Sequence, residues 1–354
     1  MEITRAAVLE APRSLRLVDR PMPTPGRGEA VVRVAATAVC HTDLSIYTGA
    51  HPGVRYPVVL GHETTGVVDS VGAGVEHLRP GQRVLVDPII ACGACDICGR
   101  GLGHLCRRAG LLGREFEGSL AEHQLLPAAN CAPLPGHLPA DAATLVETLA
   151  TVHHAQARAG VDAGDTVVVF GQGVSGLLFT QLARHAGAAR VIGVSRSAFK
   201  LELSRRLGAE HVVDAGRQDV LAEIARLTDG RGADLAIDTA GEPGVLGQAV
   251  EVVRPGGRVL VYSISHRPLS DVDAFPFYLK ELTVYGSRAL TPADLARSIE
   301  LAAGGAIRLD GFITARYPLP RVAEAFADYE RDPGRVLRLV IMPDASAPPP
   351  RHQV

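Results

Sequence analysis

The segment 165–200 constrains the fold of this chain more than any other, because it reads as a strand, a glycine turn, a helix and a second strand in succession. Thr166 to Phe170 is a short apolar, β-branched run of the kind found in strands that are buried on both faces. It continues directly into GQGVSG, which matches the pattern GxGxxG. A helix is expected from Leu177 to His185 and a second strand from Arg190 to Val194. This order predicts a dinucleotide-binding unit rather than a chance glycine turn.

Each glycine of the motif has a physical role. The first permits a tight turn, the second lets a pyrophosphate approach the backbone, and the third lets the helix pack closely against the strand. The N-terminus of the helix then faces the phosphates, because its unpaired N–H groups and its positive dipole end favour an anion. We therefore expect the pyrophosphate to contact Gly171, Gly173, Val174, Ser175 and Gly176.

The residues after the second strand bear on which dinucleotide binds. NAD-preferring sites usually place Asp or Glu there, to accept hydrogen bonds from the ribose hydroxyls. This chain has Ser195 and Arg196 instead. A carboxylate would repel a 2′-phosphate, whereas a hydroxyl and a guanidinium can both bind one. NADP is therefore favoured over NAD, and the alternative is that Arg196 is a solvated loop residue.

Length and composition leave room for two domains, since the chain has 354 residues of which 47% are hydrophobic. The net charge of −2 is spread without long runs, so we expect no nucleic-acid partner and no polybasic membrane patch. Residues 1–9 lack an apolar signal core, and no later stretch approaches the ~20 apolar residues of a membrane span. We expect a cytoplasmic protein with small-molecule partners.

Four of the six cysteines lie at metal-ligand spacing, as CGACDIC followed seven residues later by another cysteine. Four thiolates predict a closed tetrahedral zinc site, which would hold the lobe 88–110 together and leave no open coordination position. An iron–sulfur cluster and disulfides are the alternatives, but the spacing lacks the usual ferredoxin pattern and a reducing compartment disfavours disulfides. The predicted structural ligands are Cys92, Cys95, Cys98 and Cys106.

Two further clusters, CHTD at 40–43 and GHE at 61–63, also contain residue types that bind metals. Cys40 and His62 supply a thiolate and an imidazole, which suit zinc, and Glu63 adds a carboxylate. Each also has a simpler explanation, because a lone buried Cys is usually a small hydrophobic residue. The spacing alone leaves both interpretations open.

The rest of the chain shows two kinds of pattern. Residues 1–39 carry short β-rich runs between Pro and Gly clusters, which indicates a small β-barrel region. From 165 to 285 strands and helices alternate, which is typical of a doubly wound parallel sheet. After residue 288 two helices (292–303 and 320–329) and a strand (336–341) are expected. The proline-rich tail 344–354 is expected to be disordered.

With these residues in hand, the chain resembles the zinc-containing medium-chain dehydrogenases, the family of alcohol, sorbitol and threonine dehydrogenases, over residues 3–342. The resemblance rests on the two clusters, the four-cysteine lobe, Glu147, the glycine motif and the closing GRVLR at 334–338. It implies an α/β fold in which a GroES-like β-barrel catalytic domain is interrupted by a doubly wound Rossmann domain. The implied boundaries are 1–148 and 288–343 for the catalytic domain and 149–287 for the Rossmann domain.

The resemblance implies that Cys40 and His62 ligate a catalytic zinc, with a carboxylate completing the set. Glu63 and Glu147 compete for that place, and the sequence does not decide between them. A zinc ion there would act as a Lewis acid on an alcohol or a carbonyl, while hydride passes between the substrate carbon and the nicotinamide. The chain would thus hold two zinc ions, a catalytic one at this site and a structural one in the four-cysteine lobe.

Four residues around the catalytic zinc also receive roles by resemblance. Asp43 would orient His62, because a carboxylate that bonds a ligating histidine fixes its tautomer. Arg338 would pair with Asp43, with a surface strand position as the alternative. Thr42 matches the hydroxyl residue through which the family passes the alcohol proton. Many relatives continue that relay to a histidine where this chain has Ser45, so the exit of the relay is open.

On the cofactor side, the resemblance assigns His41 to the pyrophosphate, Lys200 to the region of the adenosine ribose, and Thr151 to the cofactor site. His41 and Lys200 could equally be solvated cations.

The function implied is a zinc-dependent oxidoreductase that interconverts an alcohol and a carbonyl. By analogy Glu147 favours a secondary alcohol, a polyol or a cyclitol-like hydroxyl, and the family implies a homodimer or homotetramer. One alternative is a zinc-free quinone or enone reductase of the same superfamily, which should lack Cys40, His62 and Glu63. The other is a non-catalytic sensor that binds zinc and nucleotide.

Overall fold

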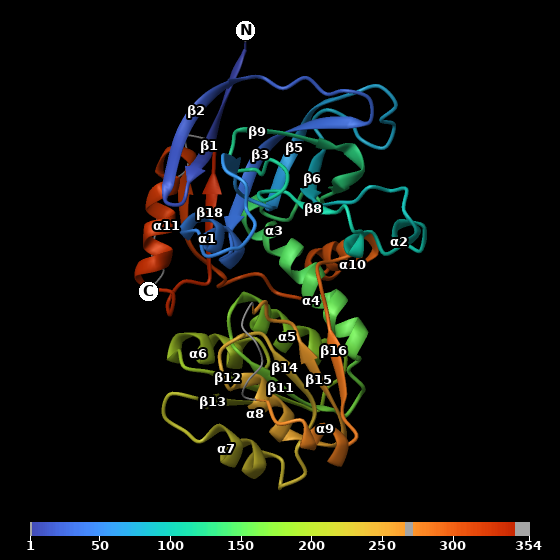
Figure 1. Ribbon diagram of the computed structural model, residues 1–354, viewed down its shortest axis with the longest axis vertical. Helices are drawn as coiled ribbons and strands as arrows, with labels where there is room; N and C mark the ends of the chain where they lie inside the picture. Colours follow the sequence, from blue (N-terminus) through green and yellow to red (C-terminus); the bar gives the residue numbers. More distant parts are fainter. Residues whose placement is uncertain (1, 266–271, 344–354) are drawn as a thin grey trace. The chain divides into compact units, whose positions relative to one another are not determined.

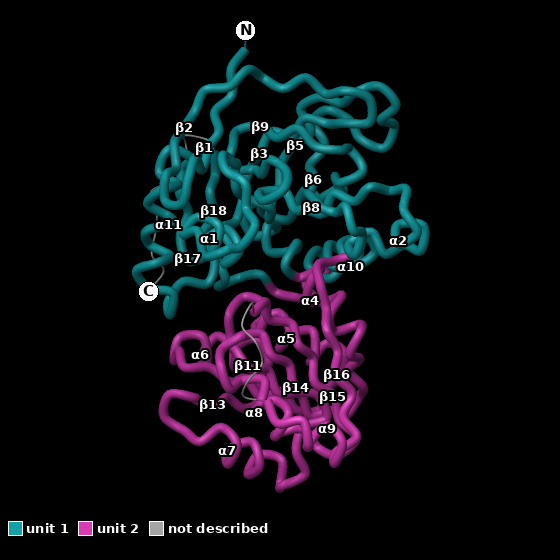
Figure 2. Tube along the Cα trace, in the orientation of Figure 1, with its two compact units in different colours: residues 1–148, 291–303, 309–354 teal, residues 149–290, 304–308 magenta. Residues whose placement is uncertain are grey.

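The computed structural model describes residues 2–265 and 272–343 (Figure 1). The tail 344–354, for which disorder is expected, lies outside the described residues. The chain divides into two compact units (Figure 2). Unit 1 comprises residues 1–148, 291–303 and 309–354, and unit 2 comprises 149–290 and 304–308. The main segment of unit 2 ends at residue 290, whereas the sequence predicted an end at 287. Residues 304–308 also belong to unit 2, and the sequence did not predict this segment.

Unit 1 is built mainly of antiparallel strands, most of which lie in two sheets, while β7 (Ile89–Ile90) and β8 (Gly110–Leu111) form a third, two-stranded sheet. β1 (Ile3–Ala11), β2 (Ser14–Pro21) and β4 (Val58–Val59) form a three-stranded sheet in the order β2-β1-β4. A seven-stranded sheet runs β10-β6-β5-β3-β18-β17, with β9 paired to β3. Its strands are β3 (Glu29–Val39), β5 (Glu63–Val71), β6 (Arg83–Val86), β9 (His123–Pro127), β10 (Cys131–Pro133), β17 (Ile313–Pro318) and β18 (Arg338–Met342). Since β17 and β18 complete a sheet begun by residues 29–133, the predicted interruption of the first domain is confirmed.

Helices and short strands complete unit 1. They are α1 (His41–Thr48), α2 (Asp96–Gly99), α3 (Ala140–Ala143), α10 (Pro292–Ala303), α11 (Val322–Arg331), β7 (Ile89–Ile90) and β8 (Gly110–Leu111). β17 was not predicted from the sequence, although its residues are alternately buried and half-buried along the strand. A buried core that includes Leu9, Leu60, Tyr317, Phe326 and Ile341 joins the first strands to the last ones. Residues from both ends of the sequence therefore fix the frame of this unit.

Unit 2 contains the predicted doubly wound sheet, with six parallel strands in the order β13-β12-β11-β14-β15-β16. The strands are β11 (Thr166–Phe170), β12 (Arg190–Ser195), β13 (His211–Asp214), β14 (Ala233–Asp238), β15 (Val253–Val261) and β16 (Thr283–Gly286). The helices between them are α5 (Val174–His185), α6 (Ala198–Arg206), α7 (Val220–Leu227), α8 (Val245–Val252) and α9 (Phe275–Leu279), while α4 (Leu145–Ala159) precedes the sheet. Every residue of β11 is buried, as its apolar run predicts. Helix α5 begins at Val174 rather than Leu177, because Gly173 is its N-cap.

Candidate functional site

The register between β3 and β5 brings two of the predicted clusters together. Ala38 of β3 lies opposite Glu63 of β5, so the chain that leaves β3 at Cys40 passes beside His62 and Glu63. The Sγ atom of Cys40 lies 3.0 Å from Nε2 of His62. One ligand atom from each of Cys40, His62 and Glu63 lies within 4.8 Å of the other two, and all three residues are buried. A thiol, an imidazole and a carboxylate therefore converge in the interior of unit 1.

Asp43 holds both the backbone and the imidazole of this cluster. One of its oxygens accepts a hydrogen bond from the N–H of Cys40 at 3.0 Å. The other accepts from the N–H of Gly61 at 3.0 Å and lies 3.4 Å from Nδ1 of His62. Burial acts to raise the pKa of Asp43, but the charge of His62 and these donors outweigh it and the pKa is lowered. For His62, burial acts to lower the pKa, and the charges of Cys40 and Asp43 raise it well above its ordinary value.

Arg338 pairs with Glu63 and not with Asp43, so the predicted partner of Arg338 is wrong. The guanidinium lies 2.8 Å from Oε1 of Glu63 and donates to Oγ1 of Thr148 at 2.9 Å and to the carbonyl of Val39 at 3.5 Å. Arg338 and Glu63 are 5% and 3% exposed, so the alternative of a surface position for Arg338 is also excluded. The physical reason is that backbone N–H groups already occupy both oxygens of Asp43. Thr148, which the sequence analysis missed, completes the arrangement.

The two oxygens of the Glu63 carboxylate have different surroundings. Oε1 lies beside Arg338 and accepts a hydrogen bond from the Thr148 hydroxyl at 3.1 Å. Oε2 is buried and has no hydrogen-bond partner among the described residues. Burial raises the pKa of Glu63, while the charges of Arg338 and His62 act to lower it. A buried carboxylate oxygen without a donor is costly unless a cation meets it, so Oε2 fits the position of a metal ligand.

Glu147 is also buried, on α4, but it is not part of the close group of ligand atoms. Burial first, and then the charge of Glu63, raise the pKa of Glu147 to about 8. It is therefore a buried neighbour of the close group and not one of its members. Of the two carboxylates that the sequence left open, Glu63 lies closer to Cys40 and His62. A set of sulfur, nitrogen and oxygen donors of this kind suits zinc.

The four predicted thiols of the lobe also converge. The Sγ atoms are 3.9 Å apart for Cys92 and Cys98, 3.5 Å for Cys95 and Cys98, 3.8 Å for Cys95 and Cys106, and 3.4 Å for Cys92 and Cys106. Tetrahedral zinc with Zn–S of about 2.3 Å requires sulfurs about 3.8 Å apart. All six cysteines are free, so the structure shows none of the disulfides considered as an alternative. The N–H of Ala94 and the thiol of Cys106 lower the pKa of Cys92 to about 6, which favours its thiolate.

Helix α1 carries the other predicted residues of the first cluster. Cys40 is its N-cap, and the N–H of Thr42 donates to the Cys40 sulfur at 3.2 Å. The Ser45 hydroxyl donates to the carbonyl of His41 at 2.8 Å, and the His41 side chain is exposed. Thr42 therefore lies beside the converging ligands, whereas the hydroxyl of Ser45 bonds to its own helix.

In unit 2, the glycine motif has the geometry that its three roles require. Gly171 has φ +86°, which few other residues adopt in a tight turn. A Cβ built on Gly173 would meet no atom within 4 Å, so the space in front of this backbone is open. A Cβ on Gly176 would lie 1.8 Å from the carbonyl oxygen of Gly171. Val174 and Ser175 begin α5, whose N-terminus has no side-chain cap and can offer its N–H groups to an anion.

Two residues that the sequence analysis missed lie beside this turn. The hydroxyl of Thr239 donates to the carbonyls of Phe170 and Gly171 at 2.9 and 3.0 Å. The hydroxyl of Tyr262 lies 2.6 Å from Oγ1 of Thr151 and accepts from Ser175 at 3.5 Å. Both follow directly on the carboxyl ends of strands, and that position in a parallel sheet is the signal that could have found them.

The carboxyl end of β12 brings together the residues predicted to read the ribose. Oγ of Ser195 accepts from the N–H of Ser197 at 3.2 Å, and Lys200 lies in the first turn of α6, where its N–H bonds to Ser197 Oγ at 3.4 Å. Arg196 is exposed and lies 3.6 Å from a carboxylate oxygen of Glu242, which the sequence analysis did not consider.

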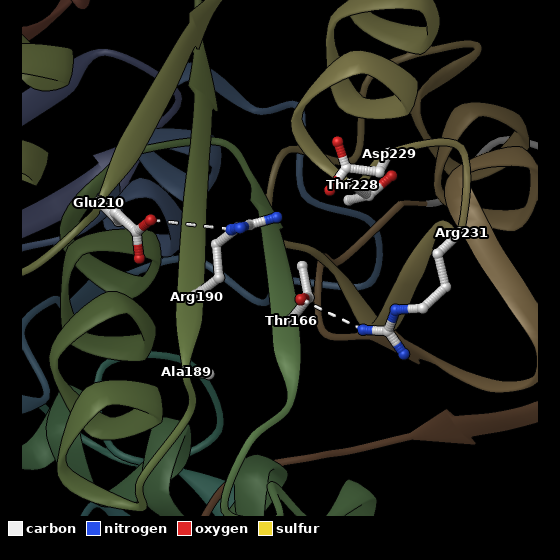
Figure 3. Close-up of a pocket in the computed structure, with 7 residues that line it drawn as sticks. All are labelled: Thr166, Ala189, Arg190, Glu210, Thr228, Asp229 and Arg231. Carbon is white, nitrogen blue, oxygen red and sulfur yellow. Dashed lines mark hydrogen bonds and ion pairs between the residues drawn. The ribbon is translucent and has the colours of Figure 1, made fainter.

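An open pocket of about 460 Å³ lies at the amino ends of the strands of the same sheet (Figure 3). Thr166 and Arg190, which line it, are the first residues of β11 and β12, whereas the glycine turn follows the carboxyl end of β11. Its guanidinium groups already have partners, because Arg190 lies 3.7 Å from Glu210 and Arg231 lies 2.6 Å from Asp234. The pocket is therefore not the predicted dinucleotide site.

Two family models match the chain. The model described as the alcohol dehydrogenase GroES-like domain matches residues 26–136, and the model described as zinc-binding dehydrogenase matches residues 175–304. Across the described residues, we find no helix with the length and apolarity needed to cross a membrane.

Individual proteins resemble the chain over nearly its whole length. The L-threonine 3-dehydrogenase of Pyrococcus furiosus is 34% identical over 88% of this chain and 90% of its own length. A putative zinc-binding dehydrogenase of Sinorhizobium meliloti 1021, solved bound to NADP, is 32% identical with a TM-score of 0.90 and covers 97% of this chain and 100% of its own. A dehydrogenase of Escherichia coli CFT073, described as a short chain alcohol dehydrogenase and complexed with NADH, is 29% identical with a TM-score of 0.90, covering 96% of this chain and 99% of its own.

Proposed function

This chain belongs to the zinc-dependent medium-chain dehydrogenases, and from that premise we propose that it interconverts a secondary alcohol and a carbonyl with two zinc ions and with NADP(H) in preference to NAD(H). The observation that carries the proposal is the buried group of Cys40, His62 and Glu63, in which one carboxylate oxygen has no partner among the described residues. A protein without a metal here has no need of an unsatisfied buried oxygen beside a thiol and an imidazole, which is why we place the catalytic zinc at this group.

Cys40, His62 and Oε2 of Glu63 would hold the catalytic zinc, and the four thiols of the lobe would hold the structural one. When bound, the catalytic zinc supplies Lewis acidity toward an alcohol or carbonyl oxygen. Asp43 beside Nδ1 of His62 keeps the proton on that nitrogen, so that Nε2 stays available as a ligand.

The chain's own residues account for two further needs of the reaction. Arg338 and Thr148 hold Oε1 of Glu63, which leaves Oε2 free. The hydroxyl of Thr42, whose backbone bonds to the Cys40 sulfur, would take up or return the alcohol proton. Ser45 would be the next group on that path, with its hydroxyl oxygen as the acceptor.

The cofactors held by solved relatives and the name of one relative support the choice of cofactor and substrate. Solved relatives hold either NADP or NADH, and Ser195 with Arg196 favours the 2′-phosphate of the former. The relative named for position 3 of threonine acts, by that name, at a carbon bearing a secondary hydroxyl. A secondary alcohol, polyol or cyclitol hydroxyl is therefore the substrate class that we propose.

We also propose that the protein is a homodimer or a homotetramer. β16 is one of the two edge strands of the parallel sheet, and its Val284 is 45% exposed. An exposed edge strand offers unpaired backbone groups to a second chain. Light scattering on the purified protein would measure the assembly, and a monomer at micromolar concentration would contradict this part of the proposal.

The function is tested by assaying zinc-loaded protein with secondary alcohols, polyols and cyclitols in comparison with ethanol, using NADP⁺ and NAD⁺ in turn. We expect turnover on the first group, and a loss of at least about 100-fold in Cys40→Ala. Cys131→Ala is the matched control, because Cys131 is buried but lies outside both metal clusters. Cofactor binding without turnover on any alcohol or carbonyl would identify a sensor instead.

Titration with NADPH and NADH tests the cofactor without knowledge of the substrate. At least about tenfold tighter binding of NADPH, equivalent to about 1.4 kcal/mol, is expected if Ser195 and Arg196 contact the 2′-phosphate. Equal binding, or tighter binding of NADH, would contradict the preference.

A further inference from the structure

The loops after β12 and β14 meet beyond the end of β11. These two strands pair with β11 on its opposite sides, and Val194 and Asp238 are both in register with Phe170. Arg196 follows Val194 closely in the chain, and Glu242 follows Asp238. Their side chains approach to 3.6 Å between Nη2 and Oε1. This ion pair therefore joins the two loops at the carboxyl ends of the strands, where the glycine turn follows β11.

The loop that carries Glu242 is held firmly. The carboxylate of Asp238, which is 3% exposed, accepts hydrogen bonds from the N–H groups of Ala240 and Gly241 at 2.9 and 3.0 Å and from the Ser263 hydroxyl at 3.0 Å. Thr239 bonds the same loop to the glycine turn. Glu242 thus extends from a loop that is hydrogen-bonded both to the glycine turn and to Ser263, which follows β15.

The ion pair itself does little for the fold, because the side chains of Arg196 and Glu242 are 73% and 57% exposed. Its effect on a bound cofactor is larger. A phosphate monoester near neutral pH carries a charge of about −1.5 to −2. A 2′-phosphate of NADP that binds Arg196 would lie near the Glu242 carboxylate and would compete with it for the guanidinium. The 2′-hydroxyl of NAD is uncharged and can donate a hydrogen bond to that carboxylate.

We propose that Glu242 is a specificity-determining residue that competes with the 2′-phosphate for Arg196 and so limits the preference for NADP(H) over NAD(H). This inference rests on the proposed function, since it assumes a dinucleotide at the glycine turn. Arg196 attracts the 2′-phosphate, Glu242 opposes it, and the balance between the two sets the ratio of affinities.

The test is isothermal calorimetry of full-length, zinc-loaded protein with NADPH and with NADH. Glu242→Gln keeps the size of the side chain and removes its charge, and Glu242→Lys reverses the charge. Glu251→Gln is the matched control: Glu251 is 52% exposed, lies 3.8 Å from Lys280, and lies near the end of α8 just before the amino end of β15. The same Glu242 substitution is repeated in an Arg196→Gln background to isolate the coupling between the two residues.

We expect Glu242→Gln to tighten NADPH binding about fivefold and to leave NADH binding within about twofold. Glu242→Lys should tighten NADPH binding further, Glu251→Gln should change neither affinity, and the effect on NADPH should shrink when Arg196 is absent. An unchanged ratio of the two affinities in Glu242→Gln and Glu242→Lys would overturn the inference alone. An equal shift of this ratio in Glu251→Gln would overturn it too, because the effect would then come from the net charge of the protein and not from the position of Glu242. Failure of the wild-type protein to bind either cofactor would overturn the proposed function, and this inference with it.

Discussion

The buried pair of Arg338 and Glu63 gives the sharpest test of the geometry in unit 1. Arg338→Met keeps an unbranched side chain of similar length but removes the charge and the hydrogen bond to Thr148. Removing one partner of a buried ion pair typically costs about 3–5 kcal/mol, because the other charge is left uncompensated. Thr148 still donates to Oε1 of Glu63, and a cation at Oε2 would add a positive charge. We therefore expect the lower end of that range, about 3 kcal/mol.

Differential scanning calorimetry of the zinc-loaded protein measures this loss. In a unit of this size each kcal/mol shifts the melting temperature by about 2–4 °C, so Arg338→Met should lower it by about 6–12 °C. The control is Arg13→Met, because Arg13 lies 2.8 Å from Glu330 but the two side chains are 57% and 30% exposed. An exposed pair contributes at most about 1 kcal/mol, or about 2–4 °C.

Equal small shifts in Arg338→Met and Arg13→Met would refute the reasoning, since burial would then add nothing to the cost. Arg338→Lys provides a second check. It keeps the charge near Glu63 but cannot reproduce the planar set of donors that reaches Thr148 and Val39, so its melting temperature should lie between those of the wild type and Arg338→Met.

Two further predictions concern the other sites. Gly176→Ala should destabilise unit 2 by about 1–3 kcal/mol in the same calorimetry, because its Cβ would meet the Gly171 carbonyl oxygen. Gly173→Ala has open space around its Cβ, so its free energy of unfolding should lie within about 1 kcal/mol of that of the wild type. It should nevertheless bind NADPH at least about tenfold more weakly, because the methyl group would occupy the approach of the pyrophosphate. Elemental analysis should find two zinc ions per chain in Cys131→Ala but only one in Cys98→Ala; two ions in Cys98→Ala would rule out a four-thiolate site.

Several features of this protein follow from causes that are local in the chain, and these could be predicted from the sequence. The glycine turn is one, because a β-branched run, three spaced glycines and a helix lie within twenty residues and each acts on its neighbours. The four-cysteine lobe is another, since its four cysteines lie within fifteen residues and only a short loop has to fold to bring their sulfurs together. The alternation of strands and helices from 165 to 285 likewise led to the parallel sheet.

Other features depend on which segments the sheets place side by side. The sequence could not choose between Glu63 and Glu147, because the choice rests on distances set by the pairing of β3 with β5. The partner of Arg338 was predicted wrongly for a similar reason, since both oxygens of Asp43 are taken by backbone N–H groups that only the folded chain brings near.

The pair of Arg196 and Glu242 shows the same division most clearly. The sequence alone predicted a role for Arg196, because it follows a predicted strand where dinucleotide-binding units usually contact the ribose. It contained no sign of Glu242, which lies 46 positions further on and follows a different strand. Local chemistry determined which groups could bind a phosphate or a metal. The order of strands in the sheets decided which opposite charges meet, because electrostatic forces depend on distance in space and not on separation along the chain.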